Sequence, residues 1–274
     1  MPVLLGDEVT IRPLRAAALQ LLDVCNSDTT SARDVVGILR TDAGMSMEIL
    51  KVANSPLYGY GGRIRSVEHA TVILGFREVS KLSLMLASAE VFRKQDAASE
   101  LRQSLWFHSL GCACVARAIA LESKLVDSEA AFLAAIVHDI GKLAFLSVCD
   151  EEYLVRFERY DGAETLEIEA EKFQVTHSDM GFLCTEDWGL PMDVVDGIQL
   201  HHEDDAVSAG GLVRVVAMAN AFARKWHIGS IERADEHVEG RCAAFRDDMT
   251  EEQVERVEQA ARTEYESMIT ACSA

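Results

Sequence analysis

The chain has 274 residues, enough for one large domain or two modest ones with separate cores. Its 49% hydrophobic content and four prolines predict a folded, mainly helical protein. The net charge is −19, and a surface of this sign repels phosphate backbones and attracts basic partners. We therefore expect protein partners and no direct contact with nucleic acid.

The cysteines and the N-terminus favour a cytoplasmic protein. The seven cysteines are scattered and mostly apolar in context, which fits a reducing compartment. Cys112 and Cys114 point about 200° apart on a helix, so they cannot bind one ion together and are predicted to be packing residues. The first residues lack the pattern of a signal peptide, and no apolar run approaches the roughly 20 residues needed to cross a membrane. We expect no membrane contact.

Short helices with capping signals fill the first part of the chain. Thr30 or Ser31 is a candidate N-cap, Ala43-Gly44 a break, and Ser66 and Gly75 the two ends of a later helix. Asn54 and Ser55 are expected to close a loop through side-chain hydrogen bonds to the backbone. The predicted helices cover residues 14–25, 31–40, 46–53, 67–74 and 79–92.

A polar stretch at residues 93–100 is expected to separate this lobe from a second group of longer, more apolar helices. Gly189-Leu190-Pro191 marks a stop followed by a restart. The predicted helices run from the polar stretch to residue 123 and over 128–148, 164–172, 177–188, 192–202 and 212–226.

The last 44 residues form an acidic segment, with twelve acidic and five basic side chains. Residues 250–253 have the form of a capping box. The apolar stripe that follows predicts a docked terminal helix or, alternatively, a partner-binding segment, and consists of Val254, Val257, Ala261, Tyr265 and Met268. We expect an all-α fold in three parts: a helical lobe (1–95), a helical bundle (96–230) and this segment (231–274).

Polar residues recur within the apolar helices of the bundle. His138 and Asp139 interrupt an apolar stretch, and burying a charge without a partner is costly. Either hydrogen bonds satisfy these groups or a metal ion holds them together. The set comprises His108, His138, Asp139, His177, His201 and His202.

Two groups of motifs resemble the HDOD family, a branch related to the HD phosphohydrolases and HD-GYP phosphodiesterases. The first group is ILKVANSPLY (49–58), IRSVEHA (64–70) and LGF (74–76). The second is WFHS (106–109), HDIGK (138–142), His177, WGLP (188–191) and His201-His202. The resemblance spans roughly residues 13–226. It implies an N-terminal helical lobe followed by an HD-like bundle, and a regulatory role in bacterial signal transduction.

The resemblance also implies roles for the polar residues. His108 and His138 would be metal ligands, Asp139 would bridge two ions, and His177, His201 and His202 would match the further histidines of the HD-GYP branch. Lys142 would contact a substrate phosphate. A centre rich in imidazole and poor in carboxylate favours iron, zinc, nickel or cobalt over magnesium, and manganese is a further candidate ion.

Two departures from the catalytic pattern argue against turnover. Asn220 stands where the family has a late aspartate, so one carboxylate is missing unless Glu203 or Asp204 replaces it. After Glu203 the chain lacks the Gly-Tyr-Pro loop of the HD-GYP branch and carries further acids instead. These acids would repel a phosphate substrate.

We therefore expect a cytoplasmic signalling protein that acts through protein contacts and keeps a degenerate metal site. The alternative is a metal-dependent phosphohydrolase acting on nucleotides or cyclic dinucleotides. A third hypothesis is an adaptor that binds a basic partner through residues 231–274.

Overall fold

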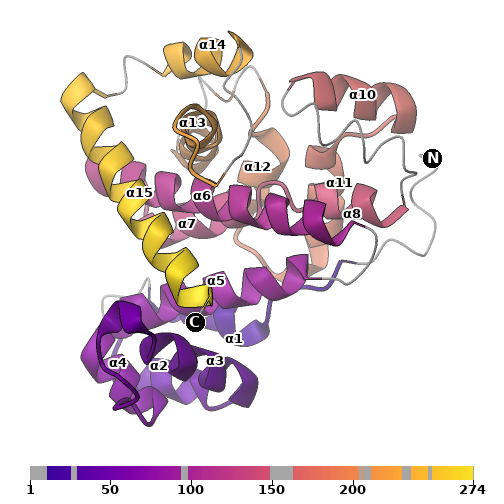
Figure 1. Ribbon diagram of the computed structural model, residues 1–274. Coiled ribbons are helices and arrows are strands. Elements are labelled where there is room, and N and C mark those ends of the chain that lie inside the picture. Colours follow the sequence, from indigo (N-terminus) through magenta and orange to yellow (C-terminus); the bar gives the residue numbers. More distant parts are fainter. Residues whose placement is uncertain are drawn as a thin grey trace. The chain divides into compact units, whose positions relative to one another are not determined.

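The structure is a computed structural model that describes residues 11–25, 30–93, 98–148, 163–203, 206, 211–229, 236–245 and 249–273 (Figure 1). Every regular element in these ranges is a helix, and no strand occurs within them. The prediction of an all-α fold is confirmed.

The chain forms two compact units. One contains residues 14–90 and 263–274, and the other contains residues 1–13 and 91–262. The C-terminal helix α15, Glu251–Ser273, therefore contributes its first part to the larger unit and its end to the smaller one. The boundaries at residues 95 and 230 stay a prediction.

Local capping and one asparagine shape the smaller unit. Ser66 accepts a hydrogen bond from the His69 backbone and caps α4, and Gly75 ends that helix at φ 86°, as predicted. Asn54 closes the loop by bonding both backbone groups of Ile64, at 2.7 and 3.0 Å. The helices are α1 (Ala16–Cys25), α2 (Ala32–Leu39), α3 (Ala43–Ala53), the 3-10 helix η1 (Pro56–Tyr58), α4 (Val67–Leu74) and most of α5 (Phe76–Phe92).

The break predicted at Ala43-Gly44 is wrong. These two residues open α3, because the Asp42 side chain accepts a hydrogen bond from the Met45 backbone at 2.9 Å and forms the N-cap. An aspartate at this position satisfies a free amide of the first turn, so the helix starts three residues earlier than expected.

The larger unit is a bundle around α6. This helix packs along α7 and α13, and α12 packs against α7, α11 and α13 (Figure 1). The helices are α6 (Ser99–Ser123), α7 (Ser128–Val137), α8 (Lys142–Val148), α10 (Ala163–Phe173), α11 (His177–Thr185), the 3-10 helix η2 (Glu186–Trp188), α12 (Met192–Leu200), α13 (Gly211–Lys225), α14 (Glu236–Ala244) and the start of α15.

Two segments of this bundle have the length and apolar composition of a membrane span, contrary to the sequence-based expectation. They are Ser99–Ser123 and Ser128–Ser147. Their apolar windows are 78% and 89% buried inside the protein, so these side chains form its core. Core helices of water-soluble bundles pass the same compositional test.

The terminal helix begins as predicted and is docked. The Thr250 backbone donates to Gln253 Oε1 at 2.9 Å, and the Gln253 backbone donates to Thr250 Oγ1 at 3.3 Å, which is the capping box. Val257, Ala261 and Met268 expose 2% of their surface or less. The apolar stripe is thus used in packing.

Candidate metal centre

The His138-Asp139 pair lies in a tight turn between α7 and α8, where the sequence predicted one continuous helix. The backbone amides of Ile140, Lys142 and Leu143 each bond the carbonyl three residues earlier, which is 3-10 geometry. A turn of this kind is narrower than an α-helix and changes the direction in which side chains point. It places Asp139 against the start of α11 and the end of α12.

Gly141 permits this approach. A Cβ atom at this position would lie 1.9 Å from the His177 carbonyl oxygen and 2.5 Å from the Gly181 backbone nitrogen. Only a residue without a side chain fits here, so the glycine of the HDIGK motif brings His177 to the pair.

His138, His201 and His177 are each held by a contact of the Nδ1 atom, the first two to backbone carbonyls and His177 to a carboxylate. His138 Nδ1 lies 2.7 Å from the Ala135 carbonyl and His201 Nδ1 lies 2.8 Å from the Ile198 carbonyl. Because a carbonyl only accepts hydrogen bonds, Nδ1 carries the proton in both rings. Each Nε2 then presents a lone pair, the form in which histidine binds a metal.

Glu169 holds the third ring. Its Oε2 accepts from His177 Nδ1 at 2.8 Å and from the His177 backbone N–H at 2.7 Å. Carboxylates of this kind commonly stand behind metal-binding histidines and fix their orientation.

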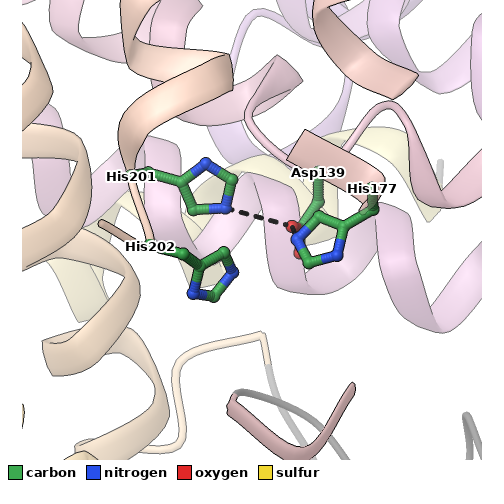
Figure 2. Close-up of side chains that lie close together, drawn as sticks. All are labelled: Asp139, His177, His201 and His202. Atoms are coloured by element: carbon green, nitrogen blue, oxygen red, sulfur yellow. Dashed lines mark ion pairs between the residues drawn. The ribbon is translucent and has the colours of Figure 1, made fainter. Parts of the chain in front are cut away.

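The Nε2 atoms converge on the two oxygens of Asp139. Oδ1 lies 3.3 Å from His177 Nε2 and 3.5 Å from His201 Nε2. Oδ2 lies 3.3 Å from His138 Nε2 and 3.7 Å from His108 Nε2. Figure 2 shows the His201 ring directed at Asp139, with His177 and His202 beside it.

These distances suit ligands that share an ion. Two ligand atoms about 2.1 Å from one ion lie about 3.0 Å apart in an octahedral site and about 3.4 Å apart in a tetrahedral site. Asp139, His177, His201 and His202 each offer an atom within 4.8 Å of the others, and His108, Cys112 and His138 form a second such group. Asp139 lies between the groups, with one oxygen toward each.

Five of these donor atoms have no hydrogen-bond partner. The Nε2 atoms of His138, His177, His201 and His202 and Oδ1 of Asp139 are buried without a hydrogen bond. Leaving such groups unsatisfied costs about 1–3 kcal/mol each. Five unsatisfied atoms directed at a common region are explained by a cation, so these residues fit a metal.

Electrostatic interactions divide the histidines into two kinds. Burial disfavours protonation of His177, but the Glu169 and Asp139 carboxylates together outweigh it and raise the pKa of His177 to about 9. Burial lowers the pKa of His201 to about 3, and burial together with the neighbouring rings lowers the pKa of His202 well below its usual value. At neutral pH His201 and His202 are therefore ready to bind a metal, whereas His177 must first lose a proton.

Lys142, the predicted phosphate contact, lies inside the cluster. Its Nζ donates to Asp139 Oδ2 at 2.8 Å, and the residue is 1% exposed. Burial alone would raise the pKa of Asp139, but the interactions with His138 and Lys142 outweigh it and hold the pKa well below its usual value. Lys142 therefore favours the ionised form of Asp139, the form that would bind a metal.

The other residues that the sequence linked to the metal centre are Asn220, Glu203 and Asp204, and the structure describes the first two. Asn220 is buried on α13 and its Oδ1 has no hydrogen-bond partner. Glu203 is exposed. Asp204 and most of the acidic loop lie outside the described residues, so their proposed roles stay predictions.

Sequence reasoning missed Glu169 and Cys112. Glu169 follows Thr165 by one helical turn on the buried side of the otherwise polar helix α10, and this position was the only signal. Cys112 was assigned to packing because it cannot pair with Cys114. Its partner is instead His108, one turn earlier, whose Nε2 lies 3.5 Å from the cysteine sulfur.

Comparison with known proteins identifies the family. The HDOD domain pattern matches residues 11–204. The chain belongs to the HDOD family. An uncharacterised protein from Treponema pallidum (strain Nichols) is 21% identical over 202 residues, which cover 70% of this chain and 37% of that protein. The chain thus spans little more than a third of that relative's length.

Several solved structures share the HDOD fold. An HDOD domain protein of unknown function from Geobacter sulfurreducens is 20% identical, with a TM-score of 0.71 over 95% of this chain and 92% of that one. A protein from Shewanella amazonensis SB2B, provisionally named a phosphohydrolase, is 22% identical, with a TM-score of 0.69 over 99% and 98%. A protein from Marinobacter aquaeolei VT8, provisionally named a signal transduction protein, is 19% identical, with a TM-score of 0.64 over 94% and 60%.

Proposed function

We propose that this chain is a bacterial HDOD signalling protein that binds a divalent metal in its His/Asp cluster and acts through contacts with other proteins, without strong hydrolase activity. The observation that carries the proposal is the set of buried imidazole nitrogens around Asp139 that have no hydrogen-bond partner. A bound ion would supply positive charge at the point where α7, α11 and α12 meet. The metal would then hold the bundle in one arrangement.

Burial of the donors supports a role in binding rather than turnover. His138, Asp139, His177 and His201 each expose 0% of their surface. A phosphoester would need a route to the ion past these buried side chains. Asn220 adds no negative charge, and Lys142 already neutralises Asp139.

A signalling role through partners draws on the family and on the surface charge. A structural neighbour is provisionally named a signal transduction protein. The charge of −19 favours basic protein surfaces over nucleic acids. The proposal places the protein in the cytoplasm, where thiols such as those of Cys184 and Cys242 remain reduced.

A phosphohydrolase is the second candidate, and one observation favours it. The two oxygens of Asp139 face different groups of imidazoles, as a carboxylate that bridges two ions would. Two ions about 3.5–4 Å apart are the usual arrangement for metal-assisted hydrolysis of phosphoesters. The Shewanella neighbour carries a provisional name of this kind.

Metal content and turnover measured on the same preparation separate the two candidates. The full chain is purified without chelators, analysed for metals, loaded anaerobically with iron or manganese, and assayed on bis(p-nitrophenyl) phosphate, nucleotides and cyclic dinucleotides. We expect bound metal that is lost in Asp139→Ala, and no hydrolysis above that of the variant. Hydrolysis that requires Asp139 would establish the phosphohydrolase instead, and a chain that takes up no metal would remove both candidates.

The contact part of the proposal has its own test. In-cell crosslinking of the full chain, followed by mass spectrometry, should return the same protein partner in replicate cultures of the source organism. A chain that returns no reproducible partner would contradict signalling by contact.

A further inference from the structure

Cys112 faces the metal centre from the central helix of the bundle. It follows His108 by four residues on α6, and residues at this spacing lie one above the other on the same helix face. Cys112 is 1% exposed and His108 is 5% exposed, so both side chains point into the protein. The sulfur and the imidazole thus share one buried surface.

The distance between them suits two ligands of one ion. Cys112 Sγ lies 3.5 Å from His108 Nε2 and 3.9 Å from His108 Nδ1, so Nε2 is the nearer atom. With Zn–S of about 2.3 Å and Zn–N of about 2.1 Å, a tetrahedral site separates sulfur and nitrogen by about 3.6 Å.

His138 is an independent sign of a ligand at the same place. Its Nδ1 is engaged by the Ala135 carbonyl, and its Nε2 is fully buried without a hydrogen-bond partner. The donor atoms of His108, Cys112 and His138 all lie within 4.8 Å of one another. Asp139 Oδ2, which also accepts from Lys142 Nζ at 2.8 Å, lies beside these donors, 3.3 Å from His138 Nε2 and 3.7 Å from His108 Nε2.

We propose that Cys112 is a thiolate ligand of the metal centre and completes a four-donor position with His108, His138 and Oδ2 of Asp139. The inference rests on the metal centre of the proposed function. On binding, the Cys112 thiol gives its proton to solvent and the sulfur forms a bond to the ion.

This assignment makes the two halves of the centre chemically different. The half formed by Oδ1 of Asp139, His177, His201 and His202 offers nitrogen and oxygen alone. The half with Cys112 offers sulfur, which selects zinc, cobalt or iron over magnesium and manganese. A sulfur-containing half also suits the tight, lasting retention of an ion more than the exchange of ligands during hydrolysis.

Cys114 provides a matched control. It lies on the same helix, is as deeply buried at 0% exposure, and belongs to neither group of potential ligands. Residues two apart on a helix point about 200° from each other. Cys114→Ser therefore changes the same atom in the same core without touching the proposed site.

Cobalt(II) spectroscopy tests the assignment. The full chain, Cys112→Ser and Cys114→Ser are titrated anaerobically with Co(II), and the near-ultraviolet band of thiolate-to-Co(II) charge transfer is followed together with the metal content. We expect the band in the wild-type protein and in Cys114→Ser and its loss in Cys112→Ser, with the metal content falling by no more than one ion per chain. A band that persists in Cys112→Ser would overturn the assignment.

The outcomes separate this inference from the proposed function. Bound metal without a thiolate band rejects Cys112 as a ligand and leaves the metal centre intact, whereas a chain that binds no Co(II) rejects both. If Cys112→Ser does not fold, X-ray absorption of the zinc-loaded wild-type protein decides. One sulfur at about 2.3 Å supports the assignment and a shell of nitrogen and oxygen alone overturns it.

Discussion

Glu169 supports the His177 ring from the side opposite the metal centre. The carboxylate accepts both the Nδ1 proton and the backbone N–H of His177, and it is fully buried. Removing such a partner commonly weakens metal binding by about 10–100-fold. We expect Glu169→Gln to weaken zinc affinity by this factor, because a neutral amide makes Nε2 less basic. Competition against a chromophoric chelator measures the change.

Glu167 on the same helix is the matched control. Its side chain is exposed, so Glu167→Gln should leave zinc affinity unchanged. In the metal-free protein, NMR should show the pKa of His177 near its expected value of about 9 in the control and clearly lower in Glu169→Gln. Equal zinc affinity in all three proteins would show that Glu169 has no part in binding.

At the scale of residues, sequence predicted which histidines lie around Asp139 better than it predicted what surrounds them. The order and spacing of His108, His138, Asp139 and His177 suffice to place them in one family pattern. Glu169 comes from a separate helix, eight residues before His177, and no local motif links the two. The sequence argument tested Cys112 only against Cys114, whereas the contact of Cys112 in the structure is with His108, one helical turn earlier.

At the scale of elements, Gly141 determines how closely α11 approaches the turn before α8. An added Cβ would meet the His177 carbonyl at 1.9 Å, and backbone atoms cannot move aside as a flexible side chain does. We expect Gly141→Ala to lower the free energy of unfolding by about 3 kcal/mol, the upper part of the range for overpacking. Because His177 must shift, zinc binding should weaken as well. Urea unfolding and zinc titration measure the two effects.

Gly240, which lies on helix α14 of the same unit, is the control for the effect of replacing a glycine by alanine where there is room for the added Cβ atom. A Cβ there would have no heavy atom within 4 Å. Gly240→Ala should raise the free energy of unfolding by about 0.5–1 kcal/mol, because alanine is the better helix former. A wild-type unfolding curve for Gly141→Ala would show that the turn and α11 separate easily.

Helices and their caps were largely predictable, whereas the turn at the centre was not. Ser66, Gly75 and Thr250 carry local signals whose physical effect is confined to one helical turn. The apolar run through residues 128–148 contains no comparable capping signal, so the sequence predicted one continuous helix there. What divides it is the packing of α11 and α12 on Asp139 and Gly141, a tertiary interaction that a local pattern does not contain.

At the scale of the whole molecule, the chain carries a charge of −19, and buried lysines pair with some of its carboxylates. In the smaller unit, Lys81 Nζ lies 2.7 Å from Glu78 and 2.9 Å from Glu264, and the lysine side chain is 8% exposed. Tyr58 donates to Glu78 at 2.7 Å. This network joins η1, α5 and the end of α15.

The network gives the chain an alkaline limit. Burial alone would lower the pKa of Lys81, but Glu264 and Glu78 outweigh it and raise that pKa. Burial, then Glu78, raises the pKa of Tyr58 above its ordinary value. The folded state therefore holds both protons more tightly than the unfolded state. Its stability is complete below about pH 10 and falls at higher pH, and the growing negative charge acts in the same direction.

Lys81→Arg tests whether the buried ammonium sets this limit. A guanidinium keeps its charge above pH 12, so we expect the alkaline fall in the free energy of unfolding to begin at higher pH than in the wild type.

Lys51→Arg, at an exposed position on α3 of the same unit, is the control and should leave the pH profile of the free energy of unfolding unchanged. Urea unfolding at intervals from about pH 8 to pH 11.5 gives the free energy of unfolding of the wild type, Lys81→Arg and Lys51→Arg as a function of pH. The pH at which each curve falls is compared rather than its absolute value, because the larger arginine side chain can change stability at every pH. Any fall that remains in Lys81→Arg should become smaller when Tyr58→Phe is added, because the second proton of the network is then also removed. If Lys81→Arg and the double variant with Tyr58→Phe both follow the wild-type profile throughout, the alkaline limit arises from the surface charge rather than from this buried network.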